Sequence, residues 1–178
     1  STIEFAVNGE SHEFKSTYEQ DGEETVTTRY FDGRECPDND EYSVVGNDSL
    51  LTPPTEEQLA RNKDLDITND IVTVNPYDAF NRVLTSLYSN LVLSEIIADE
   101  PAEEEKGSVI ALVKYTETDG TVTEIKLFKR DNTTAWAYIN GSYAGGYCRT
   151  TALFGDDYMN FDFAASLKGL KAVMALVP

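Results

Sequence analysis

The chain has 178 residues, 40% of them hydrophobic and 26% charged, so it is long enough and apolar enough to fold around a core. Its 32 acidic and 14 basic side chains give a net charge of −18. Nucleic acids and anionic membrane surfaces would repel such a chain, and we expect neither as a direct partner. No apolar run reaches the roughly 20 residues that cross a bilayer.

The sequence begins with Ser1 and shows no basic n-region or apolar h-region, so we expect either that a leader was removed or that the chain is a fragment of a longer protein. The acidic balance, the few cysteines and the strands rich in tyrosine and threonine favour an extracytoplasmic location. We expect any membrane anchor to lie in a segment outside this sequence. Cys36 and Cys148 are either a disulfide pair or two separate buried thiols.

Residues 3–7 alternate in polarity and end at Asn8-Gly9, which predicts a hairpin with a two-residue turn. In that register Phe5 lies opposite His12. A third strand is predicted over residues 25–31, ending at Asp32-Gly33. Since His12 is the only histidine and faces an aromatic ring, a structural role is favoured over a catalytic one.

Residues 37–75 predict a long irregular segment with a short helix over residues 55–62. Its oxygen-rich cluster Asp64, Asp66 and Asp70 is a weak calcium candidate. The EF-hand pattern fails there, because asparagines occupy its sixth and twelfth positions. We therefore predict a solvated loop, and no metal or cofactor.

The pair Asn75-Pro76 predicts the start of the strongest helix, because asparagine caps free N–H groups and proline suits the first helical position. An apolar stripe with helical spacing follows, and we expect the helix to end before Pro101. A charged linker is predicted over residues 99–107. The stripe consists of Phe80, Val83, Leu84, Leu87, Tyr88 and Leu91.

Residues 109–130 predict a hairpin around Asp119-Gly120, the strongest short-range hairpin signal in the chain. With these two residues as the whole loop, Thr118 pairs with Thr121. One face of the hairpin then enters the core. That predicted face consists of Ile110, Leu112, Ile125 and Leu127.

A further strand is predicted over residues 135–139, followed by Asn140-Gly141 and a strand over residues 142–151. The glycines at 145 and 146 favour a softened strand with a bulge over a phosphate-binding loop, since no helix follows at once. A closing helix is predicted over residues 161–176. Its inward residues are Phe163, Leu167, Leu170 and Val173 or Met174.

The order of elements predicts an α+β fold, with an antiparallel sheet of hairpins and two main helices on one face. We expect a single domain. Two related β-β-β-α halves are an open alternative, covering residues 1–98 and 107–178, because each half has a hairpin, a third strand with an Asx-Gly turn, and a helix.

The helix, acidic linker, hairpin, strand AWAYINGSYAGGYC and closing helix together resemble the bacterial domain-of-unknown-function family numbered 4340, best over about residues 77–178. The resemblance implies a protein of the cell envelope, membrane-anchored and facing outward. Another envelope or membrane protein would then be the partner. It supplies no catalytic residues. The chain departs from that family's pattern at Gly145-Gly146, where a more apolar strand is expected.

We therefore expect a non-enzymatic envelope domain that mediates protein interaction or assembly. The alternative is a small-ligand or carbohydrate-binding module that uses the strand aromatics. A hydrolase with a carboxylate pair is a third hypothesis, which no motif supports. The binding-surface candidates are Trp136, Tyr138, Tyr143 and Tyr147, although aromatic residues in strands more often pack on the sheet.

Overall fold

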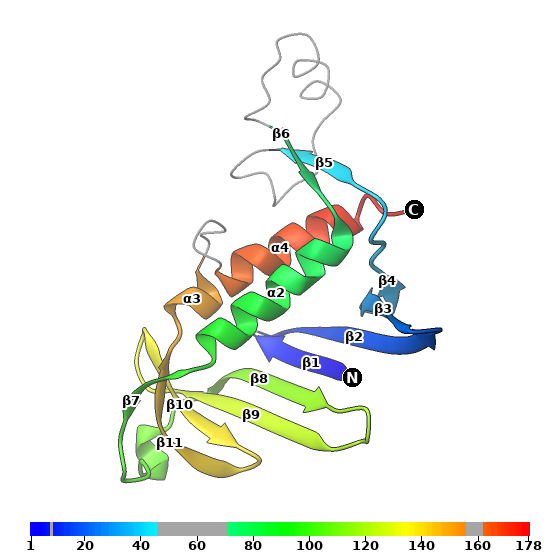
Figure 1. Cartoon of the computed structure of the whole chain (residues 1–178). Coiled ribbons are helices and arrows are strands. Elements are labelled where there is room, and N and C mark those ends of the chain that lie inside the picture. Colours follow the sequence, from blue (N-terminus) through cyan, green and yellow to red (C-terminus); the bar gives the residue numbers. More distant parts are fainter. Residues whose placement is uncertain (8, 46–70, 156–161) are drawn as a thin grey trace. The chain divides into compact units, whose positions relative to one another are not determined.

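The computed structural model describes residues 1–7, 9–45, 71–155 and 162–178 (Figure 1). Within these ranges the chain forms an antiparallel sheet of nine strands and two main helices, so the predicted α+β class is confirmed. It divides into two compact units. The first holds residues 1–35 and 90–151, and the second holds residues 36–89 and 152–178.

The nine-stranded sheet lies in the first unit, with the order β4-β3-β2-β1-β8-β9-β10-β11-β7. Neighbouring strands are antiparallel throughout, as hairpin connections require. The strands are β1 (Thr2–Val7), β2 (Glu10–Asp21), β3 (Glu24–Phe31), β4 (Arg34–Glu35), β7 (Leu93–Ile96), β8 (Val109–Thr116), β9 (Val122–Lys129), β10 (Thr134–Ile139) and β11 (Ser142–Arg149).

Two of the Asx-Gly turns form as the sequence predicts. Asp32-Gly33 and Asn140-Gly141 each have positive φ at both residues, which is the type I′ geometry of a two-residue hairpin. The first hairpin also keeps its predicted register, with Phe5 opposite His12. These local signals therefore place β1, β2, β3 and the β10–β11 turn correctly.

The predicted register of the β8–β9 hairpin is wrong by one residue. Glu117, not Thr118, pairs with Thr121, and the Glu117 carbonyl accepts the Gly120 N–H at 3.0 Å. Only Gly120 has positive φ, so the loop has three residues, a type I turn followed by a left-handed glycine. The Asp119 carboxylate supports this turn by accepting the Thr121 N–H at 2.8 Å.

The slip reverses the buried face of β8, because strand side chains alternate with a period of two. Ala111 and Val113 are buried at 2% and 4% exposure, and they lie opposite Leu127 and Ile125. The predicted pair on β8, Ile110 and Leu112, is instead half-buried on the other face. The buried face of the sheet continues through three phenylalanines, Phe5, Phe14 and Phe31.

The second unit contains α2 (Pro76–Asn90), α4 (Phe163–Met174) and most of the short helix α3 (Thr151–Phe154). The Asn75 side chain accepts the Asp78 N–H at 3.1 Å, which confirms the predicted cap of α2. The predicted stripe of α2 is confirmed at Phe80, Val83 and Leu87, whereas Tyr88 is exposed. All five inward residues predicted for α4 are buried.

A separate two-stranded sheet in the second unit pairs β5 (Tyr42–Val45) with β6 (Ile71–Val74). These strands lie at the two ends of the segment predicted to be irregular. The helix predicted over residues 55–62 lies outside the described residues.

Helix α2 ends at Asn90, and β7 follows within three residues. Residues 93–96, expected to continue the helical region, therefore form a strand. The predicted charged linker contains one short 3-10 helix, η3 (Glu103–Glu105). No helix in the described ranges is long and apolar enough to span a membrane.

The units each combine two separate stretches of chain, whereas the predicted halves follow chain order. The single domain, the related halves and the placement of both helices on one sheet face stay predictions. Cys36 and Cys148 are both buried and do not form a disulfide, in agreement with the alternative of two separate thiols. Burial raises the pKa of the Cys148 thiol to about 11, which keeps it protonated and unreactive near neutral pH.

The observed register predicts opposite outcomes for two neighbouring substitutions. Val113→Glu places a charge in the core and should cost about 3 kcal/mol or more of unfolding free energy. Leu112→Glu lies on the other face opposite Lys126 and should cost less than about 1 kcal/mol. Urea unfolding measures both, and the reverse order would support the two-residue loop.

Candidate functional site

The four predicted binding-surface aromatics lie together on β10 and β11. Trp136 pairs with Tyr147, and Tyr138 pairs with Tyr143. Their rings are in edge or tilted contact, with centroids 6.0 Å apart in the first pair and 5.6 Å in the second. Such geometries suit aromatic quadrupoles. The sequence therefore identified a true cluster, here called the aromatic cluster.

An irregularity in β11 makes this alignment possible. Tyr143 and Tyr147 are four residues apart on β11, whereas their partners Tyr138 and Trp136 are two residues apart on β10. The two additional residues preserve the alternation, so both tyrosines project from the same face. Gly145 lies inside this region with a φ of 88°, which an L side chain rarely adopts. The predicted bulge in this strand is confirmed.

All four aromatic residues donate their polar hydrogen to one segment of the chain, residues 95–105. Tyr147 bonds the Glu95 carboxylate, and Tyr143 bonds the Ile97 carbonyl at 2.9 Å. Tyr138 bonds the Glu100 carboxylate at 3.0 Å, and the Trp136 indole N–H lies 3.4 Å from the Glu105 carbonyl. Residues 97–105, here called the acidic strap, therefore cover the cluster.

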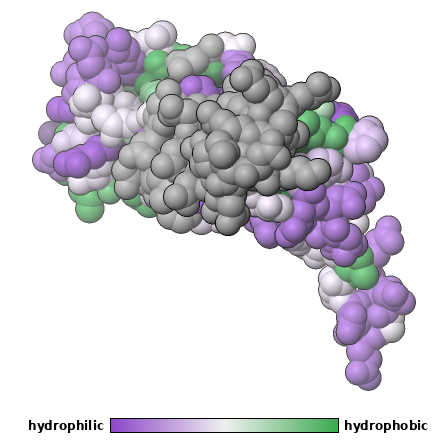
Figure 2. Space-filling view, turned by 90° about the horizontal axis from the view of Figure 1, so that it is seen from above, coloured by the Kyte–Doolittle hydropathy of each residue, from purple (hydrophilic) through white to green (hydrophobic). Residues whose placement is uncertain are grey.

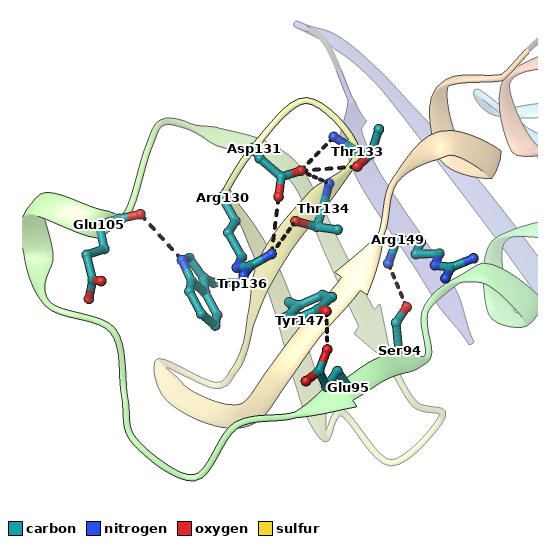
Figure 3. A network of polar contacts seen from close by, with 10 residues as sticks. All are labelled: Ser94, Glu95, Glu105, Arg130, Asp131, Thr133, Thr134, Trp136, Tyr147 and Arg149. Carbon is teal, nitrogen blue, oxygen red and sulfur yellow. Dashed lines mark hydrogen bonds and ion pairs between the residues drawn. The ribbon is translucent and has the colours of Figure 1, made fainter.

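Arg130 lies against two members of the cluster. Its guanidinium carbon is 4.3 Å from the Tyr147 ring centre and 5.1 Å from that of Trp136. Figure 3 shows that it also contacts Asp131 and Thr134, at 3.1 and 3.2 Å. The cation is thus held by stacking and by a neighbouring carboxylate.

Asp131 organises the turn that presents Arg130. Its Oδ1 accepts the N–H groups of Thr133 and Thr134, each at 2.8 Å (Figure 3). These bonds favour the ionised carboxyl and lower its pKa to about 2. Asp131 therefore stays charged beside Arg130 across the physiological pH range.

Lys106 closes the far end of the acidic strap. Its ammonium lies 4.9 Å from the Tyr138 ring centre and 5.5 Å from that of Phe128, and it pairs with Glu103. The hydrogen bond to Glu103 raises the pKa of Lys106. The residue that follows the strap thus brings a cation to the aromatic faces that the strap covers.

The covered cluster is largely inaccessible. Trp136 and Tyr138 are only 7% and 5% exposed. A polar hollow of about 540 Å³ remains beside Trp136, and its other lining residues are Arg130, Asp131, Glu104 and Glu105. The structure therefore brings the predicted aromatics together, but under the chain's own segment.

Gly146 permits β7 to pair with β11. A Cβ added at Gly146 would lie 2.1 Å from the Glu95 carbonyl oxygen, a backbone atom that cannot rotate away. A Cβ added at Gly107 would likewise lie too close to the backbone, 2.8 Å from the Lys129 carbonyl oxygen. The two glycines thus lie where close backbone contacts hold each end of the acidic strap.

Gly146→Ala should therefore separate β7 from β11. We expect faster hydrogen exchange at the Ile97 amide, which now bonds the Gly145 carbonyl at 2.9 Å, and a lower unfolding temperature. Gly120→Asn is the matched control, because nothing lies within 4 Å of its added Cβ and asparagine tolerates positive φ. Equal exchange in both variants would contradict the close contact.

The three tyrosines of the aromatic cluster should ionise at a higher pH than an unperturbed tyrosine. The bond to Glu95 raises the pKa of Tyr147, and burial is the main cause that raises those of Tyr138 and Tyr143 above 10.0. A folded pKa above the unfolded one favours the neutral phenol. The contribution of these tyrosines to the stability of the folded protein is complete below pH 10.0. It disappears as the pH rises through their pKa values in the folded state.

An absorbance titration of phenolate formation checks this order, with single Tyr→Phe variants assigning each transition. Tyr18 is the internal comparison, because a hydrogen bond to Ser1 lowers its pKa. Ionisation of Tyr143 before Tyr18 would contradict the covered cluster.

The strand β7 forms one end of the sheet and exposes apolar side chains. Leu93 and Ile96 are 41% and 81% exposed, and Val92 just before the strand is 57% exposed. Among the described residues no strand pairs with its outer side. By contrast, the coloured surface in Figure 2 is mostly hydrophilic, with small separate apolar areas.

His12 lies at the other end of the unit, between two carboxylates. Nδ1 is 2.7 Å from Asp32 and Nε2 is 2.7 Å from Glu10, while the ring stacks on Phe31 at 5.1 Å. Both ring nitrogens are therefore within hydrogen-bond distance of a carboxylate. His12 and Asp32 themselves line a pocket of about 460 Å³, together with residues that include Ala6 and Leu112. This arrangement fits the structural role that the sequence favoured.

The described ranges contain no group of three histidine, cysteine, aspartate or glutamate residues arranged to hold a metal ion. The calcium candidates Asp64, Asp66 and Asp70 lie outside those ranges.

Comparison with known proteins gave no match to any family model, curated protein or solved structure. The resemblance to family 4340 therefore stays an expectation. Sequence reasoning missed β7 as the exposed edge, although the run of Leu91 to Ile97 beside a charged linker was its visible signal.

Proposed function

We propose that this chain is a non-enzymatic extracytoplasmic domain that mediates protein interaction or assembly at the bacterial cell envelope. The observation that carries the proposal is the open edge of β7, with Leu93 and Ile96 exposed. An edge strand presents unpaired backbone N–H and C=O groups that can pair with a strand of another protein. Strand addition at β7 is the proposed contact.

The opposite edge of the sheet is better protected. It ends in β4, which has two residues, both charged and both exposed. Short charged edge strands are a common protection against unwanted pairing. The exposed part of β3 is mostly polar. The apolar side chains of β7 therefore distinguish it as the edge suited to a partner.

The envelope location is supported by the family resemblance over residues 77–178 and by the composition of the chain. The non-enzymatic assignment is supported by the hydrogen bonds of His12, the only histidine in the sequence. His12 is fixed between Glu10 and Asp32, as expected of a side chain that holds a turn to a strand.

The alternative, a small-ligand or carbohydrate-binding module, would use the aromatic cluster. Its support is the gathering of four aromatics on one face. A sugar would need open ring faces, and here Trp136 and Tyr138 are buried with their polar hydrogens used by the chain itself. The ligand would first have to displace the acidic strap.

A photo-cross-linking amino acid at position 96 tests the interaction role. In native cell-envelope extract, it should capture one reproducible protein, because the Ile96 side chain is 81% exposed at the proposed contact. The same amino acid at Ile139, 45% exposed but on an interior strand, is the control. Identical products at both positions, or none at 96, would count against the proposal.

A further inference from the structure

We infer that the partner segment is an extended strand in which apolar and basic residues alternate. This inference rests on the proposed contact at β7 and specifies the chemistry of its partner. Two observations carry it, the different character of the two faces of β7 and the charge of the segment that follows the strand.

The first face of β7 is apolar. Leu93 lies opposite Cys148 and Ile96 lies opposite Gly146, two residues of β11 that share a face because they are two positions apart. The register shift at Ser94 allows both apolar residues to project to the same side. The Ser94 hydroxyl accepts the Arg149 N–H at 3.0 Å and so completes the irregular pairing.

The second face of β7 is acidic. Glu95 lies opposite Tyr147 and turns toward its hydroxyl, as Figure 3 shows. The acidic strap continues on this face, where its contacts to Tyr138 and Tyr143 place it. Residues 91–107 contain six acidic residues and one lysine, a net charge of −5.

Two of the cations near this face have anionic neighbours, and a third, Arg149, lies near its Leu93 end. Arg130 contacts Asp131, and Lys106 contacts Glu103, whose side chain is 87% exposed. Asp99 and Glu100 act on Tyr143 as negative charges and contribute to its raised pKa. The face therefore presents net negative charge to a strand that pairs with β7.

Side chains of an added strand alternate between the two faces with a period of two. Those beside Leu93 and Ile96 would meet apolar surface, and those on the other face would meet Glu95 and the acidic strap. Directly opposite residues of unlike charge stabilise strand pairs, and like charges destabilise them. Alternating apolar and basic residues satisfy both faces at once.

A second copy of this chain is disfavoured as the occupant. Pairing β7 with another β7 would bring two acidic straps to the same sheet edge and oppose like charges. Arg149 lies near the Leu93 end, so we expect the basic residues of the partner beside Glu95 and the strap.

Fluorescence anisotropy with three synthetic peptides tests the inference. The peptides have about eight residues, the length of a typical strand. The first alternates valine and lysine, the second alternates valine and glutamate, and the third has the composition of the first in two blocks. The alternating valine–lysine peptide should bind best, and its affinity should fall with added salt.

Ile96→Lys should weaken binding of the valine–lysine peptide by about tenfold or more, because it places an ammonium group on the apolar face that the valines of the peptide contact. Ile139→Lys is the matched control and should change nothing. Asp99→Asn should weaken binding by a smaller factor. Circular dichroism confirms that each variant is folded.

The outcomes separate this inference from the proposed function. Equal binding of the valine–glutamate peptide would overturn the basic partner, and equal binding of the block peptide would overturn strand pairing. Failure of all peptides together with specific cross-linking at position 96 would reject this inference while the proposed function stands. Concentration-dependent dimers that Ile96→Lys abolishes would favour a second copy and overturn it.

Discussion

The close backbone contact between β7 and Gly146 is the constraint on which the rest of the site depends. It brings Glu95 to the hydroxyl of Tyr147 and directs the chain across β10 and β11. The polar hydrogens of Trp136, Tyr138 and Tyr143 then find acceptors on the passing strap. A buried phenol or indole without such an acceptor would lose free energy, so the cluster and the strap stabilise each other.

Much of the fold could be predicted from local chemistry, and the errors have a physical explanation. Asp32-Gly33 formed the expected turn, whereas Asp119-Gly120 formed a three-residue loop in which only Gly120 has positive φ. Both dipeptides permit both turns, and the pairing of the flanking strands decides between them. A one-residue difference in loop length then reversed the buried face of β8.

The candidate site was predicted in part. The turn at Asn140-Gly141 gives the Tyr138–Tyr143 pair, whereas the Trp136–Tyr147 pair depends on the irregularity around Gly145. The cover of the aromatic cluster could not be predicted, since residues 95–105 are remote in sequence and their acidic composition resembles that of a solvated linker. Strand β7 was missed for a similar reason, because its pairing depends on a glycine some 50 positions away.

The central claim, that β7 accepts a partner strand, is tested most directly by hydrogen exchange at two neighbouring amides. The Ile97 amide bonds the Gly145 carbonyl, so the adjacent Ile96 amide faces outward from the sheet. The account predicts that Ile96 exchanges fast in the free protein and slows when the valine–lysine peptide is present, while Ile97 stays protected throughout. Protection of Ile96 that is unchanged by saturating peptide would contradict it.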